Sequence, residues 1–268
     1  MAATTAMRPP SRAKAGATSS TWDLLVAITI RDLRVKYHGT VFSYFWWIAK
    51  PLALGLVLYF ALGRVLKLDV PHHAIFLLSA LFPWFWFQST VHAATSAFIA
   101  NDGLIKKVYF PRLILPLAVV LGNTFEFVVT LPVLALLVVA NGIAPSWTWL
   151  IGIPVLLAVQ FVLLAGLGML VASLNVFFRD TAPGLDAFLT LLFYVSPIIY
   201  PLDKVPAGIK PILLLNPLGS LIEAWRSLFI DGALPGLDLW PAVLFAAVAV
   251  VLGVTVLRRV DRNLADAL

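Results

Sequence analysis

The sequence predicts an all-α integral membrane protein, and three observations support this prediction. The 268 residues are 61% hydrophobic and 12% charged, whereas a soluble domain carries about twice that fraction of charge. Apolar runs long enough to cross a bilayer recur along the chain. The basic residues lie between those runs instead of forming one stripe, which is how membrane-orientation signals are placed.

The apolar runs predict six membrane spans. A helix needs about 20 mostly apolar residues to cross the hydrocarbon. Four runs are clear. Of the two weaker runs, the first contains Lys50 and Pro51 and the fifth contains Asp186. Each charged residue lies near one end of its run, where it can reach the interface. The expected spans are residues 45–65, 74–100, 113–140, 147–174, 183–200 and 239–257.

The distribution of basic residues predicts that both termini are cytoplasmic. With the N-terminus inside, 14 of the 19 lysines and arginines fall in cytoplasmic segments. Residues 1–19 are polar, small and basic, and no apolar signal-peptide core follows them. We therefore expect an uncleaved, disordered cytoplasmic tail there.

Residues 20–38 have the pattern of an amphipathic helix on the cytoplasmic face. Ser20 and Asp23 have the spacing of a capping box. Apolar residues then recur at helical spacing opposite three bases, Arg31, Arg34 and Lys36. The alternative is a solvated linker helix.

Residues 101–112, NDGLIKKVYFPR, form a short cytoplasmic connection that mixes two lysines with apolar and aromatic side chains. Asn101 and Asp102 can cap a short helix, and Pro111 marks its end. An ordinary connector is polar, so this composition indicates a docking surface. Aromatics resting in the lipid interface are the alternative.

Residues 201–238 form an outer segment whose apolar pieces are too short to span. Prolines at 201, 206, 211 and 217 interrupt it, and Glu223 and Arg226 lie three residues apart on one helical face. Broken helices at membrane depth must be buried in protein or line a wet cavity. The pattern favours short re-entrant helices near an exit, with a surface-lying loop as the alternative.

The chain lacks the residue patterns of an enzyme. Cysteine is absent, and the four histidines do not have zinc-site spacing. Neither a phosphate-binding loop ending in Gly-Lys-Ser/Thr nor a Gly-x-Ser-x-Gly elbow occurs. We therefore predict no catalytic residue, no metal site and no cofactor bound by this chain.

Polar residues inside the predicted spans are few. Asn123, Thr124 and Glu126 lie in the middle of the third span, and Gln160 lies in the fourth. An ionisable residue there costs about 3 kcal/mol on insertion scales, so it should face the interior or a pathway. Glu126 is expected to pair with a base from another helix, or to be protonated and structural.

Aromatic residues cluster at Trp84, Phe85, Trp86 and Phe87, deeper in the second span than interfacial anchoring requires. Aromatic faces suit the apolar C–H faces of sugars. A conduit for a glycan could use such a surface, although composition alone does not establish it.

Several strings in this order resemble a known family, the permease subunits of type-2 ABC exporters for O-antigen, capsule and teichoic-acid polymers. The resemblance extends from about Arg31 to Leu268. The strings are PWFWFQST (83–90), LIKKVYFPR (104–112), NVFFRD (175–180), SPIIYP (196–201), NPLGSLIEAWRSLF (216–229) and RNLADAL (262–268).

The resemblance implies a homodimer of six-helix permeases bound to two copies of a separate ATPase, which would hold ATP and Mg²⁺. Its cargo would be a polymer linked to a polyprenyl (pyro)phosphate lipid, moved from the cytoplasmic to the outer face of the bacterial plasma (inner) membrane. The loop of residues 104–112 would follow or form the coupling helix.

Residue roles follow as hypotheses from the patterns and the resemblance together. The ATPase-coupling set is Asp102, Leu104, Lys106, Lys107, Tyr109 and Arg112. Arg31, Arg34 and Lys36 are expected to meet the lipid phosphate at the cytoplasmic mouth. The conduit set is Trp84, Phe85, Trp86, Phe87, Asn123 and Glu126, and the outer-gate set is Tyr200, Asn216, Pro217, Glu223 and Arg226.

Two other functions are weighed against this one. A type-2 ABC permease for drugs or other lipids shares the topology but is expected to lack this set of strings. A membrane-embedded enzyme of glycolipid synthesis needs clustered acids or an interfacial metal site, and the sequence offers neither.

Overall fold

A computed structural model describes residues 21–38, 43–67, 70–108, 110–178 and 180–261. The predicted tail (1–19), Tyr109 and the terminal residues 262–268 lie outside the described residues. Within the described ranges the chain is helical and contains no strand. This confirms the all-α prediction.

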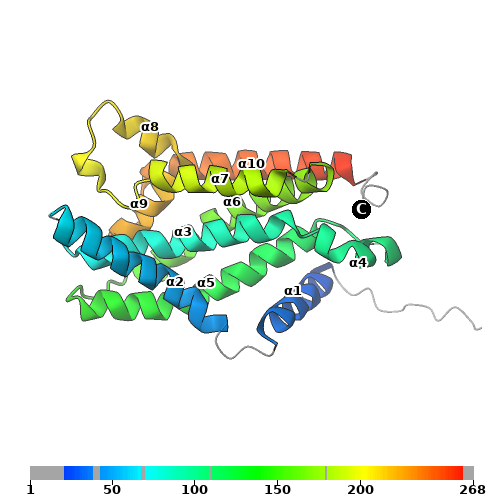
Figure 1. Cartoon of the computed structure of the whole chain (residues 1–268), viewed down its shortest axis with the longest axis horizontal. Coiled ribbons are helices and arrows are strands. Elements are labelled where there is room, and N and C mark those ends of the chain that lie inside the picture. The colour runs from blue at the N-terminus through cyan, green and yellow to red at the C-terminus, as the bar shows by residue number, and fades with distance from the viewer. Residues whose placement is uncertain (1–20, 39–42, 68–69, 109, 179, 262–268) are drawn as a thin grey trace, which may run out of the picture.

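The long helices lie side by side in one elongated bundle (Figure 1). Five segments are long and apolar enough to cross a membrane: Phe45–Val65, His73–Thr95, Ile114–Ala140, Trp149–Phe177 and Leu237–Val260. They correspond to α2 (Ser43–Leu58) with η1 (Tyr59–Val65), α3 (His73–Thr95), α5 (Ile114–Ala140), α6 (Trp149–Phe177), and η4 (Leu237–Leu239) with α10 (Trp240–Val260).

The sixth predicted span corresponds to α7 (Thr181–Val195). With 15 residues, α7 is about 22 Å long at 1.5 Å per residue, shorter than a hydrocarbon core of about 30 Å. An extended stretch follows it, because Ser196 has β-region backbone angles. The sixth crossing, the orientation and the domain limits stay predictions.

The two ends of the bundle differ in their short elements. Helix α4 (Asp102–Lys107), which follows η2 (Ile99–Asn101), lies at the same end as the C-terminus of α10 (Figure 1). Helices α8 (Lys210–Leu215) and α9 (Pro217–Ile230), which follow η3 (Leu202–Lys204), lie at the opposite end. This separation matches the predicted cytoplasmic docking segment and outer broken segment.

Helix α1 (Thr21–Tyr37) packs against the flank of α5. A Cβ added to Gly122 of α5 would meet Leu33 at 3.7 Å, so α1 approaches closely there. Leu25 and Ile28 are buried together with Ile105 of α4 and Phe110. The expected amphipathic helix therefore forms, but its apolar face covers protein.

The main core lies between α3, α5, α6 and α9. Gln160 of α6 donates from Nε2 to the Pro83 carbonyl at 2.9 Å and accepts from Trp225 Nε1 at 3.0 Å. This one amide joins α3, α6 and α9, which explains the buried Gln160 inside an otherwise apolar span.

Helices α6 and α10 are in close contact through glycines. A Cβ on Gly166 would lie 2.4 Å from the backbone carbon of Ala249, and one on Gly253 would lie 2.4 Å from the Gly166 carbonyl oxygen. Because neither position has room for a side chain, the two helices pack backbone to backbone.

The far end of α2 continues as the π-helical segment η1. Leu66 donates its amide to the Ala61 carbonyl at 3.0 Å, which is an i→i−5 bond. Such wide turns are rare and occur mostly as short insertions in α-helices.

Candidate functional site

The docking segment presents its charged residues to solvent. Asp102, Lys106 and Lys107 are exposed on α4, and Lys106 lies 3.7 Å from Asp102 one helical turn away. Leu104 is partly buried and anchors the turn against the cluster around Ile105. The structure therefore brings these four coupling residues together on one short exposed helix.

Arg112 lies behind α4 and is bound within the protomer. Its Nε is 3.2 Å from the Asp261 carboxylate at the end of α10, and its side chain is 18% exposed. Phe110 and Ile105 are buried. The apolar and aromatic side chains of this connection were expected to be exposed. This was wrong for these two residues, whereas Val108 is exposed.

The three bases of α1 have different surroundings. Arg31 donates to Asn101 beside α4 at 2.6 Å and to Asp32 at 2.7 Å. Arg34 is exposed. Lys36 lies against Glu126 of α5, with its Nζ 2.7 Å from Oε1.

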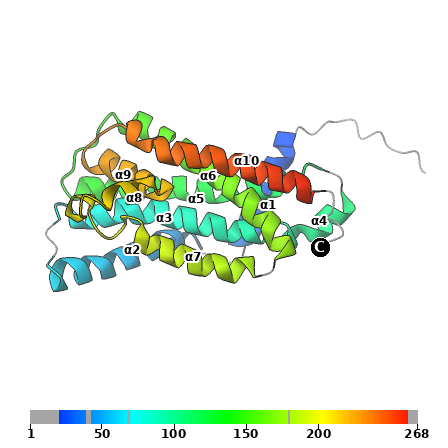
Figure 2. The same ribbon diagram turned by 90° about the horizontal axis from the view of Figure 1, so that it is seen from above.

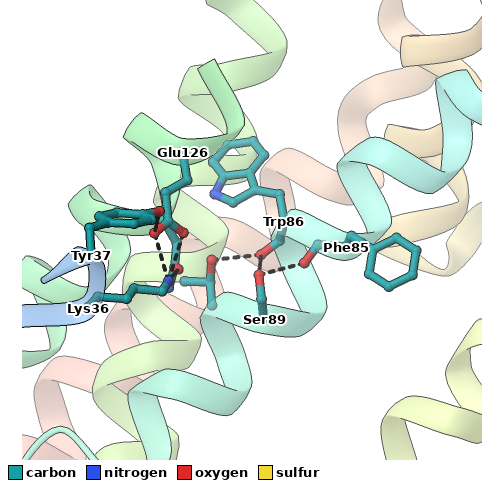
Figure 3. A network of polar contacts seen from close by, with 8 residues as sticks. Lys36, Tyr37, Phe85, Trp86, Ser89 and Glu126 are labelled. Carbon is teal, nitrogen blue, oxygen red and sulfur yellow. Dashed lines mark hydrogen bonds and ion pairs between the residues drawn. The ribbon is translucent and has the colours of Figure 1, made fainter. Parts of the chain in front are cut away.

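Glu126 is the buried centre of a polar cluster that links α1 to α5 (Figure 3). Its side chain is 1% exposed, and it accepts from the Tyr37 hydroxyl as well as from Lys36. Asn123, one turn earlier, lies 3.5 Å from the same ammonium. Glu126 pairs with a base from another helix, as expected, and the base is a predicted phosphate-binding residue.

The aromatic cluster of α3 divides between the core and a cavity. Trp86 stacks on Phe127 with ring centroids 4.5 Å apart, and Trp84 packs edge-on against Phe193 of α7. Trp84, Trp86 and Phe87 are buried against neighbouring helices, whereas Phe85 is only partly buried, and the conduit role of all four stays a prediction. Figure 3 shows Trp86 directed to the side of Glu126 and Phe85 directed away from it.

Phe85 lines a cavity of about 730 Å³ bounded by α1, α2 and α3. Lys36, Tyr37, Trp46 and Lys50 contribute to its wall. From the sequence, Lys50 was expected only to reach the membrane interface from near one end of the first span. No local pattern marks it, because the cavity joins residues from three separate segments.

Beyond the cavity, α3 presents polar residues between α2 and α7. Both helices lie on the side of α3 opposite α10 (Figure 2). His92 of α3 lies 3.1 Å from Asp186 of α7, and both side chains are more than half exposed. Within the described residues, no group of histidines and acids could hold a metal ion.

Arg226 anchors the outer segment. Its Nη2 donates to the Pro197 carbonyl at 2.8 Å and to the Ile198 carbonyl at 3.3 Å, and its Nη1 lies 2.6 Å from Glu223. The guanidinium carbon also lies 3.6 Å from the Phe76 ring centroid of α3. The predicted pair of Glu223 and Arg226 is therefore present, and it fixes the chain after α7.

The other predicted outer-gate residues surround this anchor. Asn216 caps α9 by accepting from the Leu218 amide, and donates to Ser196 at 2.9 Å. Pro217 occupies the first turn of α9, where its missing amide hydrogen is tolerated. Tyr200 donates to the Val195 carbonyl at 2.8 Å.

A bundle of membrane-length apolar helices, with a short charged helix at one end and a broken, anchored segment at the other, has the architecture of a multi-pass membrane protein. The sequence profile of the family described as ABC-2 type transporter matches residues 23–230. The chain belongs to the ABC-2 type transporter family.

Similar proteins share most of their length with this chain. An "O-antigen export system permease protein RfbA" of Klebsiella pneumoniae is 39% identical over 213 residues, 80% of this chain and 82% of the relative. The protein of the same name in Myxococcus xanthus is 32% identical over 231 residues, covering 85% and 88%. A "Polysialic acid transport protein KpsM" of Escherichia coli is 26% identical over 235 residues, covering 87% and 91%.

Proposed function

We propose that this chain is the membrane permease of an ATP-driven exporter that moves a lipid-linked polysaccharide, of the O-antigen type or a related cell-surface glycan. Movement runs from the cytoplasmic to the outer face of the bacterial plasma membrane. The observation that carries the proposal is the match to polysaccharide-export relatives over 80% or more of the chain. The family match over residues 23–230 includes the docking helix α4 and the outer segment as far as Ile230.

The energy source is a separate ATPase subunit, in two copies, that holds ATP and Mg²⁺. Helix α4 is its docking element, with Asp102, Lys106 and Lys107 in contact and Leu104 anchoring the turn. The exposure of this two-turn helix at the end of the bundle supports the assignment. Arg112 holds the base of the loop through Asp261, and Tyr109 keeps its predicted place in the contact.

A second copy of the chain completes the conduit. Helices α2 and α7 expose large apolar side chains, among them Leu56 at 58% and Leu191 at 67%, and α3 exposes His92 between them. Two such faces brought together would enclose a polar strip between apolar helices. Phe85 lines the conduit, while Trp84, Trp86 and Phe87 support its wall from behind.

The two ends of the conduit have different roles. At the cytoplasmic mouth, Arg31, Arg34 and Lys36 meet the phosphate of the lipid carrier. At the outer end, Tyr200, Asn216, Pro217, Glu223 and Arg226 form the gate. The hydrogen bonds of Arg226 to the Pro197 and Ile198 carbonyls support a gate held in one closed arrangement.

A permease for drugs or other lipids is the alternative, and export in cells separates the two. Deletion of the gene is expected to leave a lipid-linked polymer in the cytoplasm, whose composition identifies the cargo. A strain that exports its surface glycan normally after deletion contradicts the proposal.

The docking assignment is tested by charge reversal. The double variant K106E/K107E is expected to lower permease-stimulated ATP hydrolysis by about tenfold, because reversed charges at the interface repel the partner surface. The matched control is K67E, which reverses an exposed lysine in the segment between η1 and α3. Unchanged stimulation and export in K106E/K107E would remove α4 from the interface.

A further inference from the structure

The cavity bounded by α1, α2 and α3 contains more cations than acids. Lys36 is neutralised by Glu126 at 2.7 Å, and His92, which also lines the cavity, pairs with Asp186 at 3.1 Å. Lys50 makes no ion pair with any described residue. The cavity wall therefore carries one uncompensated ammonium group.

The position of Lys50 makes this imbalance informative. It lies in α2, one of the segments apolar enough to cross the membrane. An ammonium group in such a segment is costly unless it reaches water or binds an anion. A cavity that opens beside it offers both, and an anionic ligand there would bind between Lys50 and Lys36.

The remaining wall of the cavity is apolar. Trp46, Trp47, Pro51 and Phe85 line it, and the Trp47 ring lies 4.8 Å from the Lys36 ammonium. Trp46 is 57% exposed and continues into the apolar outer face of α2. A ligand that combines an anionic head with an apolar tail matches this arrangement of charge and hydrophobic surface.

Glu126 gives the site an internal substitute for the ligand. Its carboxylate accepts from Lys36 and Tyr37 at the inner wall (Figure 3). Phosphate oxygens accept the same charge-assisted hydrogen bonds from an ammonium group. An arriving phosphate therefore competes with Glu126 for Lys36, whose side chain is 45% exposed.

We propose that this cavity binds the phosphate-bearing head group of an amphiphile whose apolar tail lies along α2. Lys50 and Lys36 are the cations that bind the phosphate. Glu126 is a positioning residue that holds Lys36 at the wall when the head group is absent. The identity of the amphiphile as the lipid-linked cargo rests on the proposed function.

The test is calorimetric titration of the full-length chain, purified with its ATPase subunit in detergent, with farnesyl diphosphate as the probe. K50Q is expected to weaken binding about tenfold, because a charged hydrogen bond is lost. The double variant K36Q/E126Q removes both charges of the ion pair and so leaves no unpaired carboxylate, and it is expected to weaken binding similarly. E126Q alone is expected to tighten binding about threefold, because the competing anion is gone. The control K67Q is expected to bind like the original protein.

Two further probes separate the sources of the anion. Farnesol is expected not to bind, and inorganic pyrophosphate is expected to bind at least about tenfold more weakly than farnesyl diphosphate. Equal affinity for pyrophosphate would overturn the amphiphile assignment, and weaker binding by E126Q would overturn the role of Glu126.

The binding site and the proposed function can be disproved separately. If K50Q and K36Q/E126Q elute as folded complexes and bind the probe normally, the site is wrong even when polysaccharide is exported. If the cavity binds the probe as expected in a cell that exports no polysaccharide, the proposed function is wrong and the site stands.

Discussion

The two sides of α3 differ in how much of the protein covers them. On one side, α3 packs against α5, α6 and α9 in the main core. On the other side lie α2 and α7, which are themselves poorly covered. In the most apolar 18 residues of Phe45–Val65 only 11% are buried, compared with 78% for His73–Thr95. Side chains in the main core bind one another through buried amides and stacked rings, while α2 and α7 expose large apolar side chains.

This difference indicates that one side of α3 stabilises the fold and the other side is available for assembly. The α3–α6–α9 side is packed within one chain, and Gln160 joins its three helices through hydrogen bonds to Pro83 and Trp225. The side formed by α2 and α7 is incomplete and needs a membrane, a second copy or a ligand to cover it. Substitutions on the first side should therefore lower the free energy of unfolding, and substitutions on the second side should reduce self-association.

The largest effect is expected at the glycine contact between α6 and α10. In G166L the new side chain meets the backbone of Ala249 and Val250, with the Cβ alone 2.4 Å from both. The helices must separate, so the free energy of unfolding in detergent should fall by about 3 kcal/mol or more. Thermal unfolding of the purified chain measures this.

Gly184 of α7 supplies the control for that variant. A Cβ at this position meets nothing within 4 Å, so G184A should unfold at the original temperature or slightly above. If G166L and G184A unfold at the same temperature, the contact between α6 and α10 is less rigid than its packing indicates.

The next effect is expected at Arg226. R226Q removes its charged hydrogen bonds to Glu223 and to two carbonyls after α7, which should cost about 2–3 kcal/mol. The outer segment should also become susceptible to limited proteolysis near residues 201–209. R258Q, at an exposed arginine in the last turn of α10, should change stability by less than about 0.5 kcal/mol.

The smallest effect on folding is expected on the open side. Leu56 is 58% exposed, so L56A should alter the unfolding free energy by less than about 0.5 kcal/mol. The same variant should reduce the dimeric fraction measured by mass photometry. A clear loss of stability with unchanged self-association would place Leu56 in the protomer core and weaken the comparison.

The sequence was sufficient to predict features that depend on local spacing. Helix positions followed from apolar runs, since length and hydropathy decide a span. The pairing of Glu223 with Arg226 followed from their three-residue spacing. The exposure of Lys106 and Lys107 followed from the shortness of α4.

Features that depend on contacts between distant segments could not be predicted. The local sequence around Trp84 and Trp86 is the same whether these side chains face a conduit or the core. Their environment is set by Phe193 and Phe127, which lie far away in the sequence. Lys36 and Glu126 are 90 residues apart. Their contact requires α1 to pack against α5 near Gly122, and an amphipathic pattern does not distinguish a protein surface from a lipid surface.

The π-helical segment Tyr59–Val65 has a consequence for the length of the chain between α2 and α3. Its i→i−5 bond accommodates one residue more than an α-helix would over the same turn. If the same residues adopted α geometry instead, everything beyond the surplus residue would turn by about 100° about the helix axis. Gly63 would then leave its position beside His73, whose Nδ1 lies 2.9 Å from where a Cβ on that glycine would be. The register of the first two spans therefore depends on a single surplus residue.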